Sequence, residues 1–234
     1  MSALLTIEGG ITIGNNIAIG NVQPTNHYWL MDSGYVGNAL ALGQAGAWNP
    51  GSTTPPFIEA YATYPETGIA IGVLNGGESL YTYNPQVMFT TYIATEDPAD
   101  IPLALASVGI AYHTANLANP LGSDANSWGY REDGTVQQGG TQLAAGLPVW
   151  GPGDYIDIAL NLNTATAWVR VNGGGWNGDP AAGTGGVALN MAVNGAAGSG
   201  TDVYPAVNPG AQNFIDAIDV SLITYSIPAG FTTI

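Results

Sequence analysis

The sequence contains few residues of the types that perform catalysis. It has no cysteine and no lysine, and its only histidines are His27 and His113, so a nucleophile and its base would depend on one of two histidines. His113 lies in the segment AYHTANLANP, where a solvated or hydrogen-bonding loop histidine is expected more often than a base. No serine occupies a G-x-S-x-G motif, which would place a nucleophile on a sharp turn. The sequence therefore predicts that the protein is not an enzyme.

Paired carboxylates are the other catalytic group to consider. Glycan hydrolysis needs two carboxyl groups about 5 to 9 Å apart. Glu132 and Asp133 are adjacent, so their side chains diverge, and Asp154 and Asp157 would face opposite ways on a strand. No E-x-D-x-x-E pattern places two acids on one strand face. The alternative that remains is a pair of acids that the fold brings together from distant loops.

Oxygen ligands for calcium are present but scattered. Asp124, Asp133, Asp154 and Asp179 stand singly among glycines and asparagines, and no D-x-D-x-D-G run gathers ligands at the spacing of a calcium loop. Solvated acids explain this pattern better than a metal site does, and a cation shared between chains is the alternative. We therefore expect no metal and no cofactor.

Aromatic rings beside directional polar groups suit contacts with sugars or protein edges. One such group lies in a glycine-flanked loop between two strand signals: Trp128, Tyr130, Arg131 and Asp133. We predict that this group contacts a ligand or partner, although a core position is the favoured alternative for Trp128. A second group, Trp176 and Asn177, opens a long glycine-rich segment. Its tryptophan would stack on a sugar or bury in a neighbouring subunit, and an ordinary packed loop explains it equally well.

The two groups flank a hairpin that the sequence shows directly. In GDYIDIALNLNTATAWVRVNGG, apolar and polar residues alternate as they do in a half-buried strand. The predicted core face carries Ile156, Ile158, Leu160 and Leu162, and the predicted solvent face carries Asp157, Asn161 and Asn163. Residues 163–166 are rich in turn formers, residues 168–171 supply the return strand, and Asn172-Gly173 opens a second turn.

This hairpin is also where the sequence resembles SPRY domains. In that family a glycine-aspartate precedes an apolar strand, and a short reversal, an aromatic return strand and an asparagine-glycine turn follow. Further matches occur in the family's order: Val108-Gly109-Ile110, Leu121-Gly122, Ser127-Trp128-Gly129 and Tyr204-Pro205-Ala206-Val207. The closing segment YSIPAGFTTI resembles the end of SPRY-like modules in bacteriophage virion proteins. The resemblance is strongest over residues 85–234 and departs from the family in the long insert 173–202.

Composition agrees with the fold that this resemblance implies, an all-β antiparallel sandwich of the concanavalin-like or SPRY jelly-roll type. The 234 residues suffice for one such domain. Charged residues make up 8% and hydrophobic residues 46%, the opposite balance to a disordered chain. Glycine and proline divide the sequence into short segments, and helical periodicity never persists beyond a couple of turns. We assign residues 25–234 to one sandwich, whose outer strands come from residues 25–84.

The charge balance excludes several partners. Arg131 and Arg170 are the only residues of the Lys/Arg class, and the 17 acids give a formal net charge of -15. Because phosphate binding depends on lysine and arginine, we expect neither nucleic acid nor an anionic membrane surface as a partner. No apolar run approaches the roughly 18 residues that span a bilayer, and the first residues lack the positive end of a signal peptide. We expect synthesis in a host cytoplasm, with no membrane insertion.

The first 24 residues are organised differently from the rest. LTIEGG, ITIGNN and IAIGNV are successive hexads, each with apolar residues at its first and third positions and turn formers near its end. Those apolar positions are Leu5, Ile7, Ile11, Ile13, Ile17 and Ile19. One hexad cannot bury its own apolar face, so this short β arm should pair with its own sandwich or, equally, with the arms of other copies. Such repeats resemble the fibrous β segments of phage tail and fibre proteins.

Three functions of different classes remain. We favour a bacteriophage virion protein, such as a fibre, tail-tip or capsid-decorating protein, whose arm (residues 1–24) assembles copies and whose SPRY-like body contacts other virion proteins or a host surface glycan or protein. A trimer is the favoured homo-oligomer and a dimer the alternative. The second function is a freestanding lectin-like module that binds a glycan or a protein. The third and least favoured is a concanavalin-like glycan hydrolase.

Overall fold

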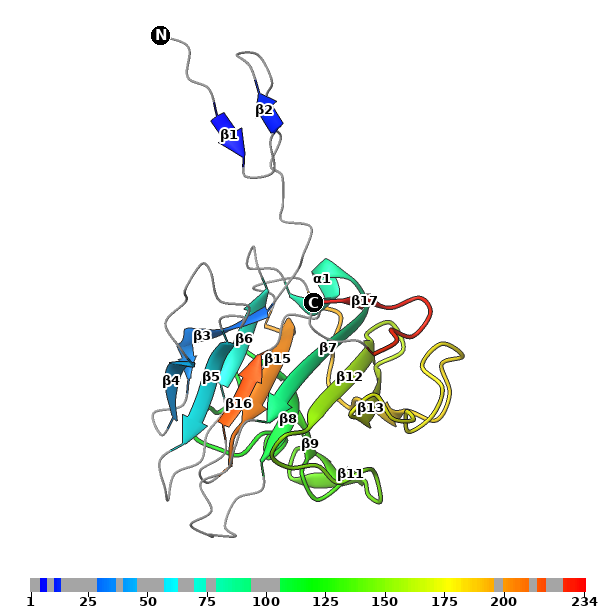
Figure 1. The fold of residues 1–234 in the computed structure, drawn as a ribbon. Helices are drawn as coiled ribbons and strands as arrows, with labels where there is room; N and C mark the ends of the chain where they lie inside the picture. Colours follow the sequence, from blue (N-terminus) through cyan, green and yellow to red (C-terminus); the bar gives the residue numbers. More distant parts are fainter. Residues whose placement is uncertain are drawn as a thin grey trace.

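The computed structural model describes the following residues: 5–7, 11–13, 29–36, 40–45, 57–62, 70–74, 79–93, 106–195, 200–210, 214–217 and 225–234. They form mostly antiparallel strands and one short helix, α1 (Leu80–Tyr83), and the strands of the body belong to two sheets (Figure 1). The predicted all-β sandwich is confirmed. Within the described part of the chain, no helix has the length and hydropathy needed to span a bilayer.

In both sheets, the strands from the first part of the chain lie at one end of the strand order. The seven-stranded sheet has the order β11 (Thr141–Ala144), β10 (Val136–Gln138), β9 (Ser127–Arg131), β8 (Ser107–Tyr112), β15 (Val203–Asn208), β6 (Ala70–Leu74) and β3 (Trp29–Val36). The eight-stranded sheet has the order β14 (Val187–Ala188), β13 (Thr166–Val171), β12 (Tyr155–Asn161), β7 (Gln86–Ile93), β16 (Phe214–Ala217), β5 (Phe57–Ala62) and β4 (Leu40–Ala45). A last short strand, β17 (Thr232–Thr233), pairs with β7 in parallel.

The hairpin of β12 and β13 forms where the alternation predicts it. Its register places Ile158 opposite Val169, so apolar side chains from both strands share the core face. Asn172 and Gly173, which form the turn after β13, have φ angles of 51° and 65°. These left-handed conformations are the ones that asparagine and glycine adopt at the least cost, which is why this dipeptide reverses the chain here.

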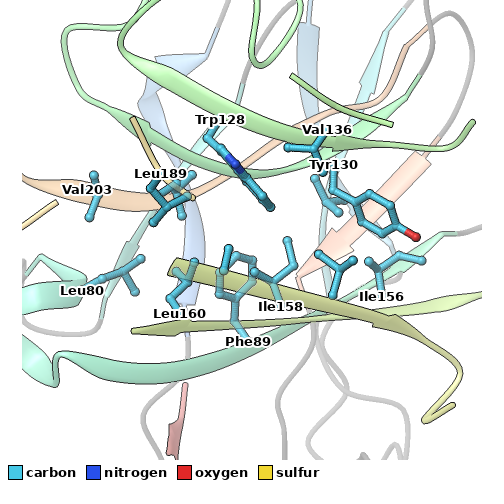
Figure 2. Close-up of a cluster of buried hydrophobic side chains, with 14 of the residues drawn as sticks. Leu80, Phe89, Trp128, Tyr130, Val136, Ile156, Ile158, Leu160, Leu189 and Val203 are labelled. Atoms are coloured by element: carbon cyan, nitrogen blue, oxygen red, sulfur yellow. The ribbon is translucent and has the colours of Figure 1, made fainter. Parts of the chain in front are cut away.

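The core lies between the two sheets. Figure 2 shows Trp128 and Tyr130 of β9 on one side, facing Phe89 of β7 and Ile158 and Leu160 of β12 on the other. All five side chains are fully buried. Large rings in this position bury much apolar area, which is the dominant favourable contribution to folding.

The outer face of β12 is also covered, which corrects one prediction. Asp157, expected on a solvent face, is 0% exposed. Residues 225–234, which we call the C-terminal segment, return across this face, and Phe231 packs with Ala159 and Trp168. The segment ends with Ile234, whose N–H donates to the carbonyl oxygen of Met88 at 3.1 Å. β12 is therefore buried on both faces along most of its length.

The N-terminal arm contributes a sheet of its own. β1 (Leu5–Ile7) and β2 (Ile11–Ile13) pair antiparallel with each other as a two-stranded sheet, separate from both sheets of the body (Figure 1). Leu5 pairs with Ile13 and Ile7 with Ile11, and alternation along each strand places these four residues on one face of the hairpin. The pair Thr6 and Thr12 belongs to the other face. The third hexad, with Ile17 and Ile19, lies outside the described residues.

Candidate functional site

β9 holds three of the four predicted contact residues of the first group, Trp128, Tyr130 and Arg131, and its geometry changes their interpretation. The sequence Ser-Trp-Gly-Tyr-Arg alternates, so Trp128 and Tyr130 point into the core while Gly129 and Arg131 belong to the outer face. Both rings are 0% exposed. The prediction that Trp128 and Tyr130 lie in a loop and contact a ligand is therefore wrong, and the core alternative holds for Trp128.

Two loops meet where β9 ends, and we call them together the end-loop surface (residues 131–135 and 145–154). The N–H of Leu147 donates to the carbonyl oxygen of Gly134, and the N–H of Trp150 donates to that of Glu132, both at 3.1 Å. Gly134 has a φ of 76°, and a Cβ added there would lie 2.3 Å from the Leu147 oxygen. Only glycine permits this close approach of the two backbones.

The Tyr130 side chain reaches from the core to the second loop, residues 145–154, and holds it in place. Its hydroxyl donates to the carbonyl oxygen of Pro148, and its ring lies 6.1 Å from that of Trp150 between centroids. Burial raises the pKa of Tyr130 well above its usual range, and the nearby charge of Asp154 raises it further. The hydroxyl therefore stays a neutral donor at any ordinary pH.

Arg131 and Asp133 are the predicted contact residues that do reach this surface. Asp133 is exposed, and its Oδ1 accepts hydrogen bonds from the N–H of Thr135 at 3.0 Å and from the Thr135 hydroxyl at 2.6 Å. This bonding fixes the turn after β9. Arg131 is half-buried, and its guanidinium takes part in no hydrogen bond or ion pair among the described residues. Its five donor N–H groups are therefore available to a ligand or partner.

The same surface presents apolar groups that the sequence analysis did not single out. Val149 is 69% exposed, the highest value for a large apolar side chain in the described part of the chain. Beside it Trp150 is 6% exposed, and its buried indole N–H has no hydrogen-bond partner among the described residues. No local motif marks Val149 or Trp150, because they join Arg131 and Asp133 only through hydrogen bonds between the loops.

The second predicted group, Trp176 and Asn177, has internal contacts. Trp176 is half-buried, and its ring covers the guanidinium of Arg170 at 4.4 Å from the centroid. The Oδ1 of Asn177 accepts the N–H of Val169 at 2.8 Å. The insert that follows folds back as a small bridge between Asp179 and Thr184. These contacts are those of the ordinary packed loop, the alternative that the sequence left open.

Arg170 itself belongs to a buried ion pair on the outer face of the eight-stranded sheet. Its Nε donates to Oδ2 of Asp157 at 2.6 Å, and its Nη2 donates to the carbonyl oxygen of Ser226 at 2.8 Å. Thr90 donates to Oδ1 of Asp157 at 2.5 Å. Burial raises the pKa of Asp157, and the hydrogen bonds from Thr90 and Arg170 and the charge of Arg170 oppose that rise. With these donors and acceptors paired, the cluster holds the C-terminal segment and offers no group to a substrate.

The remaining acids and histidines of the described residues do not gather. No group of three or more histidine, aspartate or glutamate side chains is placed there to hold a metal ion. His113 stacks on Tyr204 with ring centroids 3.8 Å apart, and the Tyr204 hydroxyl donates to Asp202 at 2.7 Å. His27 lies outside the described residues.

Comparison with known proteins identifies the fold. No protein-family model matches the sequence, and the search of curated proteins found no match. Among solved structures, the SPRY domain of human HERC1 matches with a TM-score of 0.50 and 14% sequence identity, over 70% of this chain and 90% of that chain. At this identity the similarity shows the fold alone. The body of this protein is therefore a SPRY-like β-sandwich.

Proposed function

We propose that the protein is a structural component of a bacteriophage particle: a fibre, a tail-tip or a capsid-decorating protein. Residues 1–24 assemble copies of the chain, with a trimer favoured, and the sandwich is displayed outward for adhesion or contact with a host receptor. Its partners are other copies and other virion proteins, and it is made in the host cytoplasm. The observation that carries the proposal is that β1 and β2 form a sheet separate from the body.

The register of the arm supports assembly. Two paired strands with one apolar face are at best marginally stable alone in water. Full burial of an isoleucine or leucine side chain contributes about 1.5 to 3 kcal/mol, so a partner surface covering Leu5, Ile7, Ile11 and Ile13 would stabilise the hairpin substantially. Identical hairpins around a symmetry axis provide such a surface for one another.

The end-loop surface supports the second half of the proposal. It combines an apolar contact at Val149, an unpaired cation at Arg131 and a carboxylate at Asp133, on loops joined to each other and to Tyr130. Loops held by a rigid β scaffold are a common place for recognition, because they are already ordered and lose less conformational entropy on binding. Adhesion through this end would leave the arm free to assemble.

The test is the mass in solution of the full chain and of a variant lacking residues 1–24, by light scattering at matched concentrations. Circular dichroism of both proteins checks that the shortened chain keeps its β structure. The proposal expects an oligomer, with a trimer favoured, for the full chain and a folded monomer for the variant. An oligomer that survives the deletion unchanged would remove the assembly role of the arm.

The end-loop surface also favours a second candidate, a freestanding module that binds a glycan or a protein. In that case the arm packs on its own sandwich. A monomeric full chain and an equally monomeric variant would favour this second function, because nothing would then assemble through residues 1–24.

A further inference from the structure

The edge strand β11 is unpaired on one side. It follows β10 through the turn Gly139-Gly140, and β10 is its only hydrogen-bonded strand neighbour in the described part of the chain. Thr141 and Gln142 in this strand are exposed. A free sheet edge presents backbone donors and acceptors that another strand can use.

The turn determines which backbone groups face outward. Gly139 and Gly140 have φ angles of 59° and 71°, as a two-residue hairpin turn of type I′ requires. Such a turn is closed by a hydrogen-bonded pair, here Gln138 with Thr141, so the next pair, Gln137 with Gln142, is the non-hydrogen-bonded kind. The N–H and C=O of Gln142 therefore point away from β10, toward the free edge.

The strand at this edge lacks protecting charges and proline, although β11 has only 4 residues and its pairing with β10 shifts register between Val136 and Gln137. Natural edge strands often carry lysine, other charges or proline, which discourage pairing with a second chain. Residues 134–153, which contain β10 and β11, have no charged residue, and neither do residues 180–201. The two stretches meet in the fold, because the N–H of Asn190 donates to Oε1 of Gln138 at 2.8 Å. Asp124 borders this region, because its carbonyl oxygen accepts the N–H of Gly139 at 2.9 Å, so the region is poor in charge in a chain with a net charge of -15.

We propose that β11 is a contact site for a second copy of this chain, which adds its own β11 antiparallel across a twofold axis at Gln142. Two chains that each carry a net charge of -15 repel one another, so they approach most easily where acids are few. A twofold axis makes the two edges identical and brings Gln142 opposite Gln142 of the second copy, with N–H and C=O groups exchanged. The contact joins the two seven-stranded sheets and is separate from the arm.

Site-specific cross-linking tests this contact, because the natural chain has no cysteine. Residues opposed in a hydrogen-bonded antiparallel pair have Cα atoms about 5.5 Å apart, which suits a disulfide. The full-length variant Gln142→Cys should form a covalent dimer under mild oxidation, seen on a non-reducing gel. The matched control is Asn163→Cys, because Asn163 is also exposed but lies in the turn between β12 and β13.

The proposal expects Gln142→Cys to cross-link at least about tenfold faster than Asn163→Cys, because opposed thiols have a high effective concentration. Equal rates for the two variants would overturn it. A second pair of variants tests the same axis without a covalent bond: Gln142→Lys and Gln142→Glu should each lose this contact through like-charge repulsion, and an equimolar mixture should recover it. A mixture that associates no better than either variant alone would also overturn the proposal. Assembly through residues 1–24 would change neither comparison, so the two proposals can fail separately.

Discussion

The ion pair of Asp157 and Arg170 illustrates how single residues stabilise this fold outside its core. The two residues are opposed in the register of β12 and β13, yet they lie on the face that points away from the other sheet. Both side chains are nearly inaccessible, with 0% and 3% exposed. Their burial depends on Trp176 and on Ser226, which come from the insert and from the C-terminal segment.

Replacing Arg170 with methionine would leave the Asp157 carboxylate buried without its cation and Ser226 without its donor. We expect the free energy of unfolding to fall by about 3 to 5 kcal/mol, the usual cost of leaving one partner of a buried pair. Removing both charges in the variant Asp157→Leu/Arg170→Met should recover most of that loss. Urea unfolding measures all three proteins, and a double variant as unstable as the single one would argue against this interpretation.

At the scale of elements, the C-terminal segment acts as a third layer over part of the eight-stranded sheet. Phe231 is 9% exposed and meets Trp168 edge to face, with centroids 6.2 Å apart. β17 extends the pairing of β7, and Ile234 is fully buried. The segment therefore belongs to the folded body.

Truncating Phe231 to alanine tests this layer. Because the ring is buried against Ala159 and Trp168, we expect Phe231→Ala to lower the free energy of unfolding by about 3 kcal/mol. Ile227, which is 47% exposed in the same segment, provides the control, and Ile227→Ala should stay within about 0.5 kcal/mol of the natural chain. Similar values for the two variants in urea unfolding would show that the segment contributes little packing.

The sequence predicts best those elements whose two faces differ in chemistry. β12 and β13 alternate over several residues and close through Asn172-Gly173, so they can be placed in advance. β9 is harder to predict because its outward residues are small or polar, so a buried aromatic strand resembles a binding loop in the sequence. Its period of two residues was the available signal.

Contacts between segments far apart in the sequence are harder to predict. The burial of Asp157 depends on residues 225–234, and the composition of the end-loop surface depends on hydrogen bonds that hold the loop containing Val149 against Glu132 and Gly134. Residue type was sufficient to select Arg131 and Asp133, but no local pattern indicates which second loop will lie against them. Whether a polar side of a strand faces solvent is decided by such distant segments.

At the scale of the whole molecule, the excess of acids should make stability depend on pH in an unusual direction. Burial raises the pKa of Asp157 above its ordinary value of 3.8, so its contribution to stability is fully present below about pH 3.8 and is lost as pH rises through the folded pKa. Self-repulsion from a net charge of -15 also weakens as carboxylates become protonated.

We therefore expect the melting temperature to rise when pH is lowered from about 8 to about 5 in dilute buffer. Salt screens surface charges, so added salt should raise the melting temperature more at the higher pH. Differential scanning calorimetry measures both effects. A melting temperature that falls over this range would show that other acids, stabilised as carboxylates in the fold, outweigh the repulsion.

The central claim, that residues 1–24 assemble copies through one face of a hairpin, has a direct test in two single substitutions. Ile7 and Thr6 are neighbours in β1 but belong to opposite faces of the hairpin. The measurement is the mass in solution, by light scattering, of the natural chain, Ile7→Asp and Thr6→Asp at matched concentrations. The account predicts an oligomer for the natural chain and for Thr6→Asp, and loss of the arm-dependent assembly in Ile7→Asp. Equal masses for all three proteins would contradict it.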